Sequence, residues 1–251
     1  MITPFRNMAS FFSMVAITLA FVSGMHADVL VKSGEKIVFL GDSITHQGGG
    51  AEGWCTLVVS GLKTIGIEVE QVNAGKGGNT SRDMAARVEN DVISKKPAWM
   101  TLLCGTNDNP NHGLPLDESK KNIKGIVEKA QAAGIKVIIL TMPVRGAKFD
   151  ESDYNEYIRS FAKEKKIPCA DVFAEMKKML MEVKKKNPAL AKSSTPLLAI
   201  PDGTHMNPRG NQVIAQCVLT AFGLSPEQIS KVKESWPVIP LPDADAAKSK
   251  K

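Results

Sequence analysis

Lys36-Ile37-Val38-Phe39-Leu40-Gly41-Asp42-Ser43-Ile44-Thr45 is a short apolar run that ends abruptly in Gly-Asp-Ser and then enters a glycine-rich turn. A short apolar run between polar turn residues indicates a strand that is buried on both faces of a parallel sheet. Open α/β sheets place their reactive groups beyond the carboxyl ends of such strands. Ser43 is therefore either a turn residue at a strand end or a nucleophile, and other parts of the chain must distinguish these.

Apolar runs of this kind alternate with helical segments along the rest of the chain. Further apolar runs predict strands at 67–72, 98–104, 136–140 and 167–172, and segments with helical spacing lie at 54–65, 81–91, 117–133, 150–165, 174–186 and 208–222. Strands that alternate with helices predict a parallel sheet with right-handed crossovers and helices on both faces. We therefore predict one three-layer α/β/α domain with a five-stranded parallel sheet over residues 28–236, followed by a flexible C-terminal tail at 237–251.

Composition is that of an ordinary globular protein, with 43% hydrophobic and 23% charged residues and a formal net charge of +6. Much of the positive charge lies in lysine-rich helical segments and in the tail, which we interpret as solvated surface. No basic motif is interleaved with aromatic residues, so we expect no nucleic-acid partner. The sequence leaves the oligomeric state open.

The first 27 residues resemble a targeting segment. Arg6 precedes an apolar run from Phe11 to Met25, and small residues near the end of this run and at Ala27 offer a cleavage site near Gly24 or Ala27. This order of a charged region, an apolar region and small residues is typical of a cleaved signal peptide. A retained anchor is the alternative, but the apolar run is short for a span of about 20 residues. We predict export to the periplasm or beyond the cell, with no stable membrane association after cleavage.

The chain has four cysteines, at positions 55, 104, 169 and 217, and no C-x-x-C pair or zinc-ligand spacing. Export would permit disulfides. The cysteines nevertheless fall in or beside apolar strand-like and helical patterns, which favours buried free thiols. We predict no metal site and no cofactor.

Four polar clusters follow predicted strands or precede a predicted helix. They are Gly41-Asp42-Ser43, Gly77-Gly78-Asn79, Gly105-Thr106-Asn107-Asp108 and Asp202-Gly203-Thr204-His205. Because the carboxyl ends of parallel strands meet at one edge of a sheet, we expect these clusters to converge on one crevice.

Acyl transfer requires a nucleophile, a base, a group that orients the base, and donors for the developing oxyanion. Ser43 can attack while His205 takes its proton, and Asp202 can accept a hydrogen bond from the imidazole. The backbone N–H groups of Ser43 and Gly78 and the side-chain amide of Asn107 can donate to the oxyanion. Gly78 is suited to this because the absence of Cβ allows close approach of a substrate.

Other polar residues near these clusters have plainer interpretations. Asp42 and Asp108 are expected to hold their turns by local hydrogen bonds. His46 is a rival base because it lies only three residues after Ser43, but no acid stands at a matching position near it. His112 lies in the loop after the third cluster and faces either substrate or solvent.

The clusters together resemble the sequence blocks of the SGNH hydrolase superfamily, also called GDSL-type esterases and lipases. The matching segments occur in the family's order, at 41–44, 73–80, 105–108 and 202–205. The resemblance implies a flavodoxin-like fold, a triad of Ser43, Asp202 and His205, and an oxyanion hole of Ser43, Gly78 and Asn107. The chain departs from the pattern at Gly77, where a serine often precedes the glycine of the second block.

The resemblance implies a secreted serine esterase that works through an acyl-enzyme. Exported relatives in this family that lack a long apolar lid are often carbohydrate O-acetyl esterases, and no such segment is present here, so the resemblance implies hydrolysis of O-acetyl groups on a carbohydrate. The alternative is a lysophospholipase or thioesterase of the same fold, and a non-catalytic carbohydrate-binding protein is a third. Nucleotide binding is disfavoured because residues 75–80 do not fit G-x-G-x-x-G and no P-loop spacing occurs.

Overall fold

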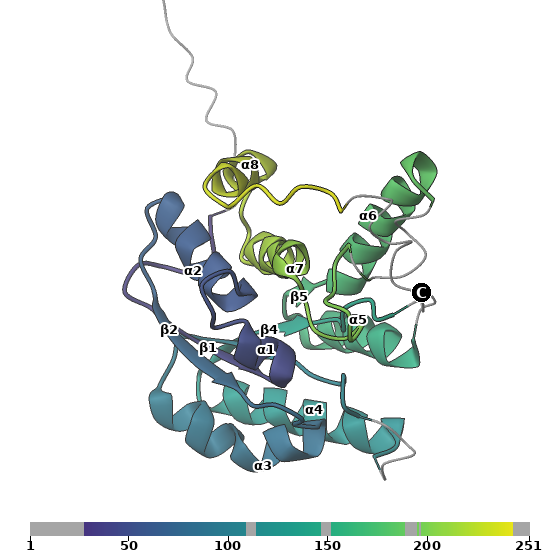
Figure 1. Ribbon diagram of the computed structural model, residues 1–251. Coiled ribbons are helices and arrows are strands. Elements are labelled where there is room, and N and C mark those ends of the chain that lie inside the picture. The colour runs from purple at the N-terminus through teal and green to yellow at the C-terminus, as the bar shows by residue number, and fades with distance from the viewer. Residues whose placement is uncertain (1–27, 109–113, 147–151, 189–194, 196, 243–251) are drawn as a thin grey trace, which may run out of the picture.

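The computed structural model describes residues 28–108, 114–146, 152–188, 195 and 197–242. Its centre is one sheet of five parallel strands in the order β2-β1-β3-β4-β5 (Figure 1). The strands are β1 (Lys36–Gly41), β2 (Glu70–Gly75), β3 (Trp99–Leu103), β4 (Lys136–Leu140) and β5 (Cys169–Ala170). The predicted five-stranded parallel sheet and the flavodoxin-like strand order are confirmed.

The direction of strand addition reverses next to β1, because β2 pairs with one side of β1 and β3 with the other. Gly41, at the end of β1, lies in register with Gly75 of β2 and Leu103 of β3. The loops after these three strands therefore leave the sheet side by side. A reversal of this kind opens the crevice in which doubly wound folds bind their ligands.

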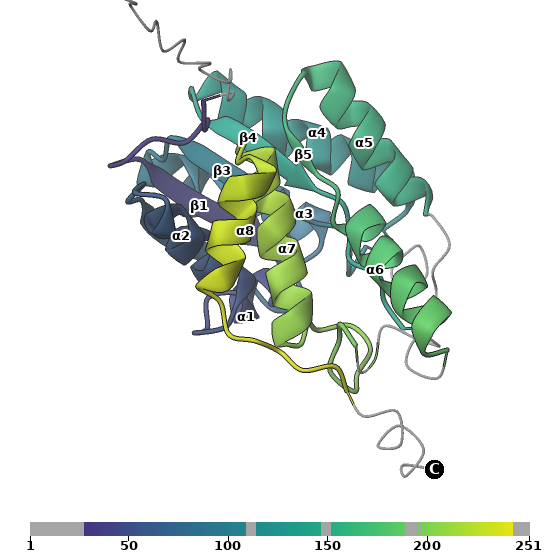
Figure 2. The same ribbon diagram turned by 90° about the horizontal axis from the view of Figure 1, so that it is seen from above.

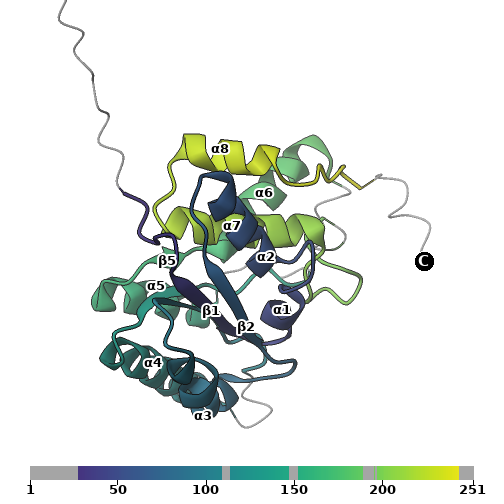
Figure 3. The same cartoon turned by 90° about the vertical axis from the view of Figure 1, so that its left-hand side faces the viewer.

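Two helical layers enclose the sheet (Figure 3). One contains α1 (Ser43–Gln47), α2 (Trp54–Thr64), α6 (Val172–Lys186), α7 (Pro208–Ala221) and, outside α2 and α7, α8 (Pro226–Glu234). The other contains α3 (Ser81–Asp91), α4 (Leu116–Ala132) and α5 (Asp153–Lys165), and a short 3₁₀ turn spans Ile93–Lys95. The three-layer α/β/α arrangement is thus confirmed.

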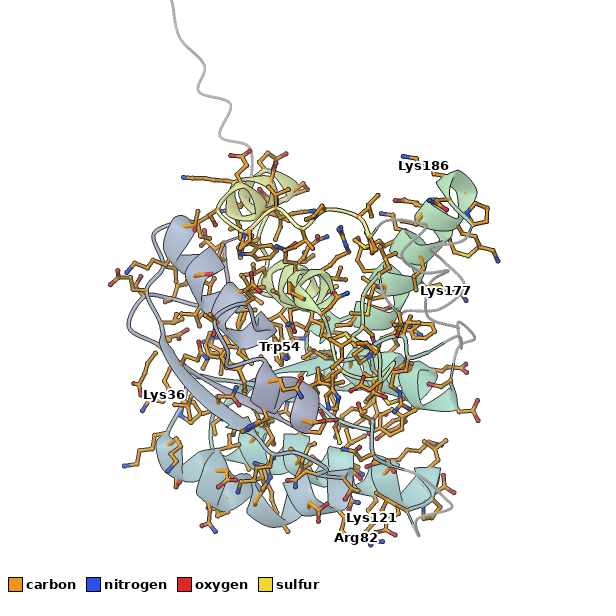
Figure 4. All side chains as sticks on the ribbon, in the orientation of Figure 1. Lys36, Trp54, Arg82, Lys121, Lys177 and Lys186 are labelled. Atoms are coloured by element: carbon orange, nitrogen blue, oxygen red, sulfur yellow. The ribbon has the colours of Figure 1, made fainter. Side chains whose placement is uncertain are left out.

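The strand β1 divides its side chains between the two layers. Phe39 belongs to the core beneath α2 and α7, whereas Leu40 belongs to the core against α3, and both are fully buried. Trp54 of α2 meets Phe39 edge to face at a ring separation of 5.3 Å and lies against the sheet (Figure 4). Burial on both faces explains why β1 is a continuous apolar run and not an alternating one.

Two predicted strands have different bounds in the structure. The strand expected at 67–72 begins only at Glu70, because the N–H of Ile67 closes the end of α2 by bonding to the carbonyl of Leu62. The strand expected at 167–172 pairs only over Cys169 and Ala170. Asp171 instead caps α6 by accepting from the N–H of Ala174.

The helix α8 was not predicted. A capping box between Ser225 and Gln228, with a proline at the first helical position, was the available signal. After α8 the chain passes the N-terminal end of α7 (Figure 2), where the carbonyls of Pro237 and Ile239 accept hydrogen bonds from the side chains of Gln212 and Arg209. Hydrogen bonds to α7 therefore reach into the segment that was predicted to be a flexible tail, as far as residue 239.

The predicted signal peptide at 1–27 lies outside the described residues. Of the helices that the structure describes, none is long and apolar enough to span a bilayer. All four cysteines are free thiols, and Cys169 is partly exposed while the other three are buried.

Candidate active site

Ser43 is the first residue of α1 and directly follows the turn at the end of β1. The buried carboxylate of Asp42 caps this helix, with its Oδ1 atom accepting from the N–H of Ile44 at 2.9 Å. Asn73 on the neighbouring strand fastens the turn by donating to the carbonyl of Thr45 at 2.8 Å. The predicted structural role of Asp42 is confirmed. The backbone N–H of Ser43, at a helix start, has no partner within its own helix.

His205 and Asp202 reach Ser43 from the loop before α7. The Nε2 atom of His205 is 2.8 Å from Oγ of Ser43, and its Nδ1 atom is 2.6 Å from Oδ2 of Asp202. The other carboxylate oxygen of Asp202 accepts from the N–H groups of Thr204 and His205 at 2.8 and 2.9 Å. The structure thus joins the three predicted triad residues in one hydrogen-bonded chain.

These hydrogen bonds keep the carboxyl group of Asp202 ionised. Partial burial raises the pKa of Asp202, but the His205 ring and the two backbone N–H groups outweigh it and lower the pKa to about 2. Asp202 is therefore a carboxylate at neutral pH. A carboxylate in this position favours the His205 tautomer with a proton on Nδ1, which leaves Nε2 free to accept the proton of Ser43.

Gly78 and Asn107 come from the loops after β2 and β3, on either side of β1. Gly78 has φ +75° and no neighbouring atom within 4 Å of the place a Cβ would occupy, so its backbone is open to a ligand. The Nδ2 atom of Asn107 donates to the carbonyl of Asn79 at 3.0 Å. Because an asparagine amide has two N–H groups, one remains to bind an oxyanion.

The rival histidine has a different environment. The Nδ1 atom of His46 lies 3.3 Å from the carbonyl of Gly75, and its side chain is exposed. Asp108 was expected to hold its own turn by a local hydrogen bond, but its carboxylate instead accepts from the N–H of Ser81 at 2.8 Å and joins the loop after β3 to the start of α3. Gly77 is exposed, and no atom lies within 4 Å of its Cβ position. His112 lies outside the described residues.

Two arginines near the site were missed. Arg87 on α3 donates to groups at the ends of β1 and β2, and Arg145 after β4 donates to the carbonyl of Thr106 at 2.8 Å. Arg145, Phe173 and Asp202 also line a cleft of about 520 Å³ beside the triad. The sequence did offer a signal for Arg87, because this charged residue stands among the apolar positions Met84 and Val88, which are buried on an amphipathic helix. No comparable pattern marks Arg145.

Among the residues that the structure describes, no three histidine, cysteine, aspartate or glutamate side chains are grouped closely enough to hold a metal ion. The serine, imidazole, carboxylate and amide groups of the site are those that acyl transfer requires.

Comparison with known proteins gives consistent matches over most of the chain. Residues 39–213 match the model of the GDSL-like lipase/acylhydrolase family. An acetylxylan esterase from Geobacillus stearothermophilus is 29% identical over 222 residues, covering 77% of this chain and 96% of that protein. An uncharacterized lipoprotein, YqeF of Bacillus subtilis, is 25% identical over 219 residues, covering 72% and 86%.

Solved structures of acetylxylan esterases resemble this chain as well. The crystal structure of Axe2, an acetylxylan esterase from Geobacillus stearothermophilus, superposes with a TM-score of 0.66 at 26% identity and covers 78% of this chain and 97% of that one. The acetyl xylan esterase AlAXEase superposes with a TM-score of 0.64 at 32% identity, covering 74% and 98%. Both likenesses extend over nearly the whole of the compared proteins.

Proposed function

We propose that this chain, which belongs to the GDSL-like lipase/acylhydrolase family and is a carboxylic ester hydrolase, removes acetyl groups from a carbohydrate through an acyl-enzyme on Ser43. The observation that carries the proposal is the hydrogen-bonded chain from Ser43 through His205 to Asp202. In the first step Oγ of Ser43 attacks the ester carbonyl carbon, and its proton passes to Nε2 of His205. Asp202 stabilises the imidazolium that forms.

The tetrahedral intermediate carries its negative charge on the former carbonyl oxygen. The N–H groups of Ser43 and Gly78 and the free N–H of the Asn107 amide donate to this oxygen. When the intermediate collapses, the sugar hydroxyl leaves with the proton from His205 and the acetyl group stays on Ser43. A water molecule, deprotonated by His205, then attacks the acyl carbon, and acetate leaves as Ser43 regains its proton.

A carbohydrate substrate is supported by two features. The acetylxylan esterases compared above share the fold and the family, and the match extends over nearly their full length. The cleft beside the triad mixes polar and apolar side chains, among them Arg145, Asn155 and Phe173. Such a lining suits a polar sugar better than a long acyl chain, which requires a continuous apolar surface.

Export is the second part of the proposal. It is supported by the apolar run from Phe11 to Met25 after Arg6, and by the likeness to a protein described as a lipoprotein. Export would give the enzyme access to a polymeric substrate outside the cytoplasm. Expression of the whole chain in a bacterial host, followed by fractionation and N-terminal sequencing, tests this. Full-length protein confined to the cytoplasm would contradict it.

The substrate class is tested with a panel of esters on the purified protein. We expect turnover of p-nitrophenyl acetate and of acetylated xylo-oligosaccharides, with kcat/KM falling steeply for acyl chains of eight carbons and above. A preference for the long chains would instead support the lysophospholipase or thioesterase alternative. Sugar binding without turnover would indicate a carbohydrate-binding protein.

The nucleophile is tested by Ser43→Ala, with Ser60→Ala on α2 as the matched control because its hydroxyl donates to the carbonyl of Leu57 in its own helix. We expect Ser43→Ala to lose about 10⁴-fold or more in kcat, as removal of a nucleophile in a triad does. A fluorophosphonate should label Ser43 in the unaltered protein. Undiminished hydrolysis by Ser43→Ala would refute the mechanism.

A further inference from the structure

We propose that Arg87 is a positioning residue that holds the oxyanion hole in register with the nucleophile. This inference deepens the proposed function and rests on it. Arg87 lies on α3 with only 11% of its side chain exposed. Its guanidinium donates four hydrogen bonds, and three of them go to segments that carry the groups of the candidate site.

The first two of these bonds tie the strand ends together. Nη2 donates to the carbonyl of Gly41 at 2.9 Å, two residues before Ser43, and Nη1 donates to the carbonyl of Ala74 at 2.7 Å on the neighbouring strand. Gly41 is the last residue of β1, and Ala74 is the second-last residue of β2, which pairs with β1. Arg87 therefore fixes the turn of the nucleophile relative to the loop that follows β2.

The third bond extends this link to the oxyanion donors. Nε of Arg87 donates to Oδ1 of Asn79 at 2.7 Å, and Asn79 directly follows Gly78. The carbonyl of Asn79 in turn accepts from the Nδ2 atom of Asn107 at 3.0 Å. One side chain thus connects, in a single chain of contacts, the segments that bear Ser43, Gly78 and Asn107.

The fourth bond anchors Arg87 itself. Nη1 also donates to Oδ2 of Asp91, one turn later on α3, at 2.8 Å, and the same oxygen accepts from Nζ of Lys76 at 2.7 Å. A planar guanidinium with five donors can hold several acceptors in fixed directions, whereas a lysine ammonium is a single point of charge. The arrangement requires an arginine. Oxyanion donors must be held to within about 0.5 Å to be effective, and this network supplies that constraint.

The test compares Arg87→Met and Arg87→Lys with the unaltered enzyme on p-nitrophenyl acetate. We expect Arg87→Met to lower kcat by about tenfold or more while KM changes less than about threefold, because the lost positioning acts in the transition state. Arg87→Lys should restore only part of the loss. Guanidinium ions at millimolar concentration should partly rescue Arg87→Ala, whereas equal sodium chloride should not.

Two control variants on the same helix separate positioning from folding. Arg82→Met removes an exposed ion pair with Glu118 on the outer surface (Figure 4) and should leave kcat unchanged. Val88→Ala removes buried methyl groups beside Arg87 and should lower the unfolding midpoint without lowering kcat. If Arg87→Met lowers only the midpoint, as Val88→Ala does, the inference is overturned.

A double-mutant cycle identifies the route of the effect. If Arg87 acts through Asn79 on Asn107, then Arg87→Met should cost at least about threefold less kcat in an Asn107→Ala background than in the unaltered enzyme. Independent, multiplicative losses would contradict this route. Should the unaltered protein hydrolyse no ester, the proposed function fails. A crystal structure of Arg87→Met then decides the positioning role, because unmoved Asn79 and Asn107 would overturn it.

Discussion

The Nε2 atom of His205 lies 2.8 Å from Oγ of Ser43, although 162 positions separate the two residues in the chain. Each stands beside a helix start: Ser43 begins α1, and the loop of His205 leads into α7, capped by Asn207. Because α7 packs against α2 and α6 over the sheet, the distance between base and nucleophile depends on the packing of these helices.

Replacement of the two histidines should separate their roles. His205→Gln should lower kcat by about 10³-fold or more, because Ser43 loses its proton acceptor. His46→Gln should retain kcat within about twofold, because within the part of the chain that the structure describes the His46 ring contacts the carbonyl of Gly75 and not Ser43. Steady-state hydrolysis of p-nitrophenyl acetate measures both. A large loss in His46→Gln with activity kept in His205→Gln would reverse the assignment of the base.

The amide of Asn107 should act on the transition state. Asn107→Ala should lower kcat by about 10²- to 10³-fold with little change in KM, as the loss of one oxyanion donor does. Asn90→Ala, on the exposed side of α3, is the matched control and should behave as the unaltered enzyme. An effect of Asn107→Ala confined to KM would assign the residue to substrate binding.

Gly75 and Gly77 should differ sharply in how well they tolerate replacement by alanine. A Cβ on Gly75 would come within 2.1 Å of the backbone nitrogen of His46, so Gly75→Ala should displace α1 and lower the free energy of unfolding by about 2 kcal/mol or more. Gly77→Ala meets no atom within 4 Å and should be neutral or stabilise by up to about 1 kcal/mol. Urea unfolding compares the two. Equal destabilisation would contradict the packing of α1 on β2.

The buried carboxyl of Asp42 should make stability depend on pH. Burial raises its pKa despite the N–H of Ile44 and the nearby Thr106. A raised pKa means that the folded state binds the proton more tightly, so this contribution to stability is lost as pH rises from about 4 through the folded pKa. Asp42→Asn can keep the Ile44 hydrogen bond but cannot ionise. Its stability relative to the unaltered protein should therefore increase between pH 4 and pH 7.

The control for this experiment is Asp117→Asn, because the Asp117 side chain is 95% exposed. This variant shows how much of the measured pH dependence comes from the loss of a surface carboxylate in general. A stability difference for Asp42→Asn that stays constant between pH 4 and pH 7, or that falls with pH, would show that Asp42 is not destabilised as an anion.

The contribution of Asp202 to stability should depend on pH in the opposite sense to that of Asp42. Its pKa of about 2 lies below the ordinary value, so its contribution to stability is complete above about pH 4 and disappears as pH falls toward 2. Asp202→Asn should remove this acid dependence in urea unfolding. The same variant should lose about 10²- to 10⁴-fold in kcat, because an amide at Nδ1 favours the wrong imidazole tautomer. Unchanged kcat in Asp202→Asn would exclude it from the triad.

Much of the architecture was predictable because it follows from local patterns. Burial of β1 on both faces requires an uninterrupted apolar run, and the polar residues after it mark the edge of the sheet. The short edge strand β5 was overestimated, because Asp171 caps a helix where an apolar pattern suggested continued pairing. The apolar pattern alone does not reveal where a side chain such as that of Asp171 hydrogen-bonds to the backbone and so ends a strand.

The sequence by itself determined the layered parallel fold and the residue types gathered beyond the strand ends, because strand period, caps and turn residues are local properties of the chain. Only the tertiary structure decided which of those residues meet. It placed His205, and not His46, on Ser43, and it brought the guanidinium of Arg87 to the carbonyl of Gly41 and the side chain of Asn79. Such contacts join segments far apart in the chain, and helix packing over the sheet sets their distances.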